Sequence, residues 1–171
     1  FIESELTGEN VPCLIPAAID QDPYWRVTRD VAPKLGYFKP AQIHCKFLPG
    51  LGKGGKMSAS LPETCIFTTD TPETAEKKIW NAFTGGKPTV KEQKIYGGDP
   101  FICPIYYYDY YLFEEDDEKM KEIYKKCRNG ELLCGDHKTM LAEKVKKFLE
   151  EHQRKREKAK DLLEDFLFKN G

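Results

Sequence analysis

The sequence predicts an α/β fold over residues 1–69, followed by an all-helical part over residues 70–171. Near the amino terminus, two apolar runs with strand-like patterns flank one run with helical periodicity, which indicates a strand–helix–strand unit. A glycine-rich stretch, residues 47–60, follows the second strand-like run directly. After Pro72 the apolar residues recur at helical spacing, and no further strand is predicted.

The first predicted strand covers residues 11–19, which are apolar on both faces, as buried parallel strands are. Asp20 and Gln21 follow at its carboxyl edge, where open α/β sheets bind their ligands. Asp22 is the expected N-cap of the next helix, and Pro23 suits the first helical position.

That helix should end or bend at Pro33, with Gly36 as its left-handed cap. Helical spacing marks an apolar stripe that we expect to be buried: Tyr24, Val27 or Thr28, Val31 and Leu35.

Ile43, Cys45 and Phe47 alternate with polar residues and predict a second strand that leads into the glycine loop. A strand–helix–strand unit places residues 18–22 and 48–60 at the same edge of one sheet. Because glycines lack Cβ atoms, their backbone N–H groups can surround an anion closely. The loop also carries cationic and hydroxyl donors suited to a polyphosphate: Lys53, Lys56, Ser58 and Ser60. Composition alone favours a solvated surface loop, and the predicted sheet edge favours the phosphate-binding interpretation.

Five helices are predicted in the second part, over residues 72–83, 89–96, 105–113, 117–129 and from Asp136 toward the end. Ala75, Ile79 and Ala82 should face inward, with Gly85 and Gly86 closing that helix. Thr89 and Glu92 form a capping-box pattern. The aromatic run 105–113 predicts a central buried helix, with base stacking as the less favoured alternative.

The basic run 152–160 is typical of a solvated helix face, and a tRNA phosphate track through Arg154, Lys155 and Arg156 is the minority interpretation.

The 28 acidic and 27 basic residues nearly cancel. No apolar run is long enough to span a bilayer. Six scattered cysteines without a C-x-x-C pair suit reduced thiols in a cytosolic protein, and a zinc site from Cys127, Cys134 and His137 is a weak alternative. The abrupt opening at Phe1 is typical of the middle of a longer protein.

The string Lys56-Met-Ser-Ala-Ser60 resembles the KMSKS signature of class I aminoacyl-tRNA synthetases, in the form typical of tryptophanyl enzymes. Residues 17–33 are similar to the eukaryotic and archaeal tryptophanyl-tRNA synthetase signature, and Asp22-Pro23-Tyr24 favours that family over the tyrosyl one. Three further segments match it in order and spacing: 66–71, 82–86 and 151–153. The resemblance covers nearly the whole chain.

This resemblance implies the carboxyl-terminal half of a Rossmann-like catalytic domain (1–69) followed by a helical anticodon-binding domain (70–171). It implies ATP-dependent activation of tryptophan and its transfer to tRNA(Trp), by a cytoplasmic homodimer without a protein-held metal, with Mg²⁺ arriving on ATP. Lys56 would contact the phosphates, Ser58 and Ser60 would donate to them, and the Met57 backbone would lie against adenine. Asp20 would bind the ribose and Gln21 the tryptophan or adenylate; Lys87 would contact the anticodon.

Two departures from the family pattern matter. Ala59 replaces the second lysine of the signature, and Lys53 is the residue that would compensate. The HIGH motif is absent, since His44, His137 and His152 are isolated, so we expect this chain alone to be inactive. Two other classes of function remain open: a non-catalytic nucleotide- or RNA-binding module, and a protein-interaction fragment on the same scaffold.

Overall fold

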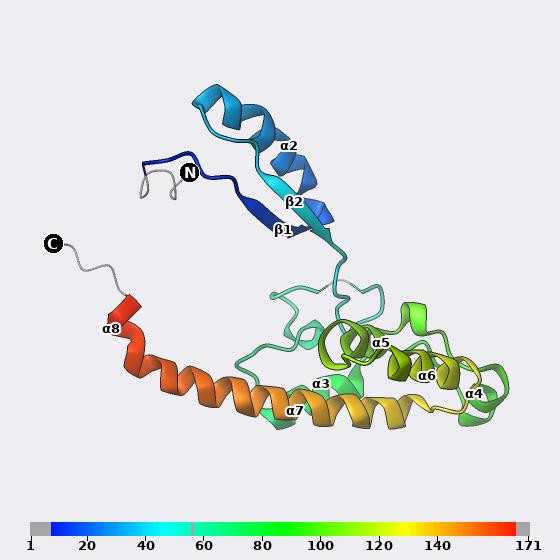
Figure 1. Cartoon of the computed structure of the whole chain (residues 1–171). Helices are drawn as coiled ribbons and strands as arrows, with labels where there is room; N and C mark the ends of the chain where they lie inside the picture. Colours follow the sequence, from blue (N-terminus) through cyan, green and yellow to red (C-terminus); the bar gives the residue numbers. More distant parts are fainter. Residues whose placement is uncertain (1–7, 56, 167–171) are drawn as a thin grey trace. The chain divides into compact units, whose positions relative to one another are not determined.

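The computed structural model describes residues 8–55 and 57–166, and the chain divides into two compact units, Phe1–Phe47 and Leu48–Gly171 (Figure 1). Each unit is described by itself. The predicted boundary at residue 69 rests on the family resemblance and stays a prediction. By contacts, the glycine loop belongs with the helices that follow it.

The first unit is a strand–helix–strand unit, as predicted. Strand β1 (Leu14–Ala18) and strand β2 (Ala41–Cys45) pair in parallel, with Leu14 opposite Ala41 and Ala18 opposite Cys45. Helix α2 (Asp22–Val31) makes the crossover, preceded by the 3₁₀ turn η1 (Ile19–Gln21) and followed by η2 (Ala32–Leu35). The N-cap of α2 is Gln21 and not Asp22, which is already helical because η1 runs directly into α2.

The predicted burial of this unit is wrong. Tyr24, Val27 and Leu35 are 70%, 63% and 59% exposed, and Leu14 of β1 is 60% exposed. Their spacing is helical or strand-like as expected, but two strands and one helix provide too little surface to cover either face. Gly36 does take the predicted left-handed conformation, at φ 82°, and its N–H closes η2.

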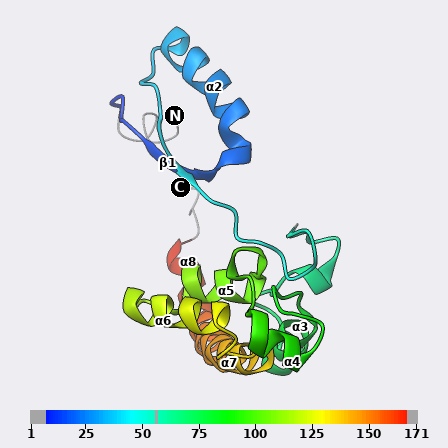
Figure 2. The ribbon, with the colours of Figure 1, turned by 90° about the vertical axis from the view of Figure 1, so that its right-hand side faces the viewer.

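The second unit is helical. Within residues 8–55 and 57–166, strands occur only at β1 and β2, so the prediction that no strand follows Pro72 is confirmed. Figures 1 and 2 both show α3 beside the long α7. The elements in chain order are η3 (Pro62–Thr64), α3 (Pro72–Asn81), α4 (Val90–Tyr96), η4 (Pro100–Ile102), α5 (Pro104–Tyr108), the π-helical η5 (Asp109–Phe113), α6 (Asp117–Arg128), α7 (Cys134–Ala159), η6 (Lys160–Leu162) and α8 (Leu163–Phe166).

The core of this unit lies where α3 and α5 pack on α7. Ala75 and Ile79 of α3 are fully buried and Ala82 is 7% exposed, as their spacing predicts. They meet the buried stripe of α7 together with Leu51 from the glycine loop. The α7 residues of this core are Leu141, Ala142, Val145 and Leu149.

Several local predictions for the helices are confirmed and others are corrected. Thr89 and Glu92 form the capping box of α4, and Gly130 ends α6 at φ 74°. Gly85, however, is not in the left-handed region. A Cβ there would lie 1.8 Å from the Asp99 carbonyl oxygen, so this glycine is required by close backbone approach. The last helix is interrupted at Lys160, where η6 begins.

The aromatic run is helical but only half buried. Ile105 and Tyr108 face the core, whereas Tyr110 and Leu112 are 49% and 55% exposed. Burial raises the pKa of Tyr108 to about 12. Within the described ranges, no helix combines the length and apolarity that crossing a bilayer requires.

One buried carboxylate joins this run to α7. Asp109 is 0% exposed, and its two oxygens lie 3.0 Å from His137 Nε2 and 2.7 Å from Lys144 Nζ. Burial raises the pKa of Asp109, but the hydrogen bonds from His137 and Lys144 outweigh that effect and hold the pKa below its usual value. Lys144 also reaches Glu114, at 3.1 Å.

We expect Asp109→Asn to lower the free energy of unfolding by about 1.5–3 kcal/mol, because a charge-assisted hydrogen bond to Lys144 is lost while Lys144 keeps its pair with Glu114. A carboxylate with a depressed folded-state pKa stabilises the fold above the unfolded-state pKa of about 3.9 and stops doing so as pH falls through the folded-state value. Urea unfolding from pH 6 to pH 2 should therefore show a smaller acid loss in Asp109→Asn than in wild type. Asp161→Asn, at an exposed position, is the matched control; equal acid losses in Asp109→Asn and wild type would contradict this account.

Candidate functional site

The glycine loop is ordered by a short turn and by one buried side chain. The Gly50 N–H donates to the Gly55 carbonyl at 2.8 Å, and Gly54 and Gly55 have φ values of 92° and 70°, which favour glycine. Leu51 is 1% exposed within the helical core, and its carbonyl accepts from the Phe83 N–H at 2.8 Å. The loop is therefore attached to the helices, while Lys53 at its tip stays exposed.

The structure brings Ser58 and Ser60 together. Their hydroxyl oxygens lie 2.8 Å apart, and Ala59 between them is exposed. Lys56 lies outside the described residues, so its assignment remains a sequence-based expectation. Met57 is 40% exposed and lines an apolar pocket with Phe67, from the segment before α3, and with Phe113 of η5 and Phe148 of α7.

Two residues that the sequence did not single out hold the Ser58 peptide. Thr64 Oγ1 accepts from the Ser58 N–H at 3.1 Å, and the Cys65 thiol donates to the Ser58 carbonyl at 3.2 Å. Thr64 and Cys65 are 9% and 5% exposed. The only sequence signal for them is that they follow the Lys56–Ser60 string closely and lead into the matched segment 66–71, since contacts across six or seven residues of loop leave no periodic pattern.

The segment after this anchor is clamped by α3 and α7. Gln153 Nε2 donates to the carbonyls of Thr68 and Asp70 at 2.9 and 2.8 Å. Lys78 lies 2.6 Å from the Asp70 carboxylate, with both side chains 13% exposed, and its ammonium sits over the Phe67 ring. Two of the segments that carry the family resemblance, 66–71 and 151–153, are therefore in direct contact, because Gln153 of the second binds the backbone of the first.

The predicted residues of the first unit lie at the carboxyl end of β1. Asp20 and Gln21 occupy η1, both exposed, and Gln21 Nε2 donates to Asp20 Oδ2 at 3.1 Å. Asp22 lies next to them and pairs with Arg26 at 2.7 Å and with His44 Nε2 at 3.7 Å. The location at a strand's carboxyl edge matches the prediction, and the ligand contacts themselves stay predictions.

The predicted tRNA residues lie at two places on the helical unit. Lys87 is exposed, and its N–H donates to the buried Gln93 Oε1 at 2.7 Å, beside a hollow that includes the first turn of α7. Arg154, Lys155 and Arg156 are exposed on α7. Lys155 pairs with Glu151 at 2.6 Å and Arg156 with Glu157 at 3.4 Å, as on a solvated helix face.

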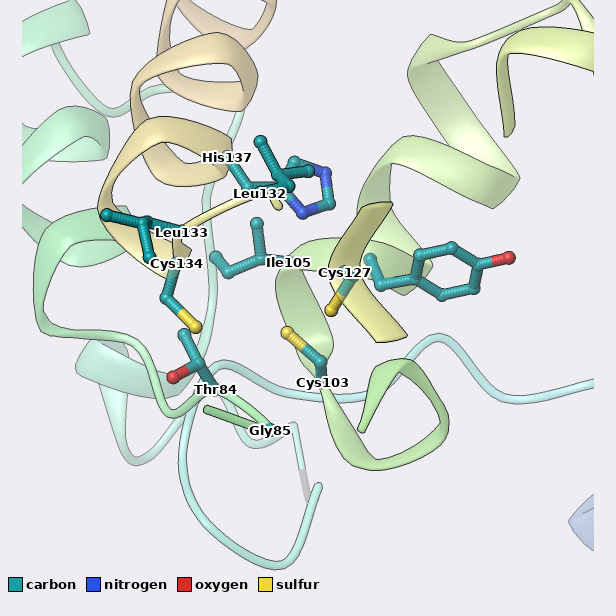
Figure 3. A pocket seen from close by; sticks show the side chains of 10 residues that line it. Thr84, Gly85, Cys103, Ile105, Cys127, Leu132, Leu133, Cys134 and His137 are labelled. Atoms are coloured by element: carbon teal, nitrogen blue, oxygen red, sulfur yellow. The ribbon is translucent and has the colours of Figure 1, made fainter. Parts of the chain in front are cut away.

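The three residues of the weak zinc alternative line one narrow pocket (Figure 3), together with Cys103. Figure 3 shows the sulfur atoms of Cys103 and Cys127 directed toward each other, whereas that of Cys134 points toward Thr84. Burial raises the pKa of Cys103, and raises that of Cys127 to about 11. His137 is bonded to Asp109. Among the described residues, no group of three or more His, Cys, Asp or Glu is arranged to hold a metal ion. All six cysteines are free thiols.

Comparison with known proteins agrees with the sequence resemblance. A tryptophan–tRNA ligase of Pyrococcus horikoshii is 55% identical over 162 residues, which cover 94% of this chain and 42% of that protein. One from Thermococcus sibiricus is 58% identical over 157 residues, covering 91% of this chain and 41% of that protein. The crystal structure of tryptophanyl-tRNA synthetase from Aeropyrum pernix K1 superimposes with a TM-score of 0.84 at 44% identity, covering 88% of this chain and 42% of that one.

The chain thus spans about two fifths of the length of these relatives. Its mixed helices and small parallel sheet are those of a class I tRNA synthetase fold. The family described as tRNA synthetases class I (W and Y) matches residues 8–150, and the chain belongs to that family.

Proposed function

We propose that this chain is the carboxyl-terminal part of a tryptophan–tRNA ligase, which activates tryptophan with ATP and transfers it to tRNA. The observation that supports this most is the identity of 55–58% to proteins of that name over more than nine tenths of the chain. The chain also carries the Lys56–Ser60 string, which resembles the KMSKS signature.

In this proposal residues 1–69 complete a Rossmann-like catalytic domain and residues 70–171 form the anticodon-binding domain. Lys56, with Lys53, would neutralise the ATP phosphates, and Ser58 and Ser60 would donate hydrogen bonds to them. Asp20 and Gln21 would address the ribose and the tryptophan or its adenylate. Mg²⁺ would enter with ATP as part of the substrate, and the full-length protein would act as a cytoplasmic homodimer.

The chemistry requires little more than positioning and charge. The carboxylate of tryptophan attacks the α-phosphate, and negative charge accumulates on the departing pyrophosphate. A loop with mobile ammonium groups and fixed hydroxyls would stabilise that charge most in the transition state. The anchored Ser58 peptide supports this role, because donors held in place need no reorganisation during the reaction.

The chain alone should not catalyse tryptophan-dependent exchange between ATP and pyrophosphate, because it carries no HIGH motif. The full-length protein that contains this sequence should catalyse it and serves as the positive control. Exchange by the isolated chain would contradict the division of labour proposed here. A full-length protein that binds tRNA or ATP without exchange would instead be a non-catalytic binding module.

Lys56→Ala in the full-length protein should slow adenylate formation by about 10²–10³, the usual effect of removing one donor to developing charge. Tryptophan affinity should change little, since the contact strengthens only as pyrophosphate departs. Lys53→Ala should cost less, unless Lys53 replaces the cation missing at Ala59, in which case the two losses should be similar. Single-turnover measurements with saturating substrates decide this, and a Lys56→Ala rate within about threefold of wild type would exclude the loop from catalysis.

Lys87→Ala should weaken tRNA binding and reduce the slope of log affinity against log salt by about one, because one phosphate contact is lost. Lys34→Ala, an exposed cation in η2, is the control and should leave that slope unchanged. Filter binding with tRNA(Trp) at several salt concentrations gives both slopes. Identical slopes for Lys87→Ala and wild type would mean that the tRNA contact lies elsewhere.

A further inference from the structure

Thr64 is hydrogen-bonded to both Leu51 and Ser58 of the glycine loop. We propose that it is a positioning residue that holds Ser58 in the arrangement required for binding the polyphosphate. This inference rests on the proposed function and extends it to a residue outside the signature string. The hydrogen bonds of Thr64 and of its neighbour Cys65 carry it.

The Thr64 hydroxyl is used fully within the loop. It accepts from the Ser58 N–H at 3.1 Å, and two carbonyls lie within reach of its single proton, that of Leu61 at 2.7 Å and that of Ser58 at 3.3 Å. The Thr64 carbonyl accepts from the Leu51 N–H at 3.0 Å, and the Thr64 N–H donates to the Leu61 carbonyl at 2.9 Å. One residue therefore joins the entry of the loop, at Leu51, to the serine turn, at Ser58.

This connection has a rigid base. Leu51 is 1% exposed in the core formed with α3 and α7, and Thr64 and Cys65 are both buried. The Cys65 thiol donates to the Ser58 carbonyl at 3.2 Å, so both polar groups of the Ser58 peptide region are bound by residues 64 and 65. The position of the Ser58 turn is therefore determined by its contacts with the buried residues 64 and 65.

The anchor uses the backbone of Ser58 and leaves its hydroxyl for a ligand. Ser58 Oγ lies 2.8 Å from Ser60 Oγ, and neither hydroxyl bonds to Thr64 or Cys65. The fixed main chain thus presents two neighbouring hydroxyls in a preorganised arrangement. Preorganisation matters because small displacements of hydrogen-bond donors steeply reduce the rate of reaction.

Substitution at Thr64 separates this role from packing. Valine keeps the shape of threonine but offers no acceptor to the Ser58 N–H, whereas serine keeps the hydroxyl. Thr139→Val is the matched control, since the Thr139 hydroxyl donates to the Gly135 carbonyl within α7 and has no contact with the loop.

In the full-length protein, Thr64→Val should lower kcat for adenylate formation by about tenfold, with a smaller change in KM for ATP, because a lost hydrogen bond of this kind is equivalent to roughly that factor. Thr64→Ser should stay within about threefold of wild type, and Thr139→Val should be unchanged. In the isolated chain, Thr64→Val should speed tryptic cleavage after the exposed Lys53 several-fold, measured by mass spectrometry.

Wild-type kcat in Thr64→Val, or equal losses in Thr64→Val and Thr64→Ser, would overturn the inference. If Thr64→Val fails to fold, Cys65→Ala removes the thiol's bond to the Ser58 carbonyl and its contact with Thr64 Oγ1 at 3.5 Å. It should show the same kcat-weighted loss at smaller size, and no loss there overturns the proposal. If the wild-type full-length protein shows no exchange, the proposed function fails and the positioning role fails with it. In that case, faster tryptic cleavage of Thr64→Val after Lys53 would show only that Thr64 anchors the loop, without a role in catalysis.

Discussion

The burial of Leu51 is the constraint on which the candidate site depends. The stretch around it contains four glycines, whose ordering costs more conformational entropy than that of any other residue. Leu51 is almost fully buried among residues of α3, α5 and α7, and full burial of a leucine contributes about 1.5–3 kcal/mol. Its N–H and carbonyl are bonded to Thr64 and Phe83. The loop therefore has one fixed point, from which the Ser58 turn and the exposed Lys53 extend.

Polar contacts extend this support from the core to the surface. Gln153 and Lys78 hold the segment 67–70, and Lys138 donates to the carbonyls of Trp80 and Ala82 at the end of α3. Deeper in the unit, Asp109 is fully buried and bonded to His137 and Lys144 on α7. Apart from the Lys78 pair, which lies between α3 and the segment before it, each of these contacts joins α7 to a segment distant in sequence. Helix α7 therefore organises the unit through specific hydrogen bonds as well as apolar packing.

In the first unit the predicted order of elements was right and the predicted burial was wrong. The order strand, helix, strand followed from apolar spacing, and parallel pairing of β1 with β2 confirmed it. Burial of Tyr24, Val27 and Leu35 did not follow, because periodicity states which residues share a face and not whether another element covers it. The glycines show a similar division: Gly36 and Gly130 cap elements as predicted, whereas Gly85 is required by contact with Asp99, fourteen residues away.

By itself the sequence determined the family, the order of elements, the capping box at Thr89 and the signature string at Lys56–Ser60, because these depend on local spacing and on residue types in a short window. Only the tertiary structure decided that Leu51 is a core residue, that Thr64 and Cys65 hold Ser58, that Gln153 binds segment 68–70, and that Asp109 is buried with two partners from α7. These contacts join loops to helices, join one helical element to another, or lie within one loop, and they share no common period. Their existence follows from which surfaces meet when α3 and α5 pack on α7, and no local pattern encodes that.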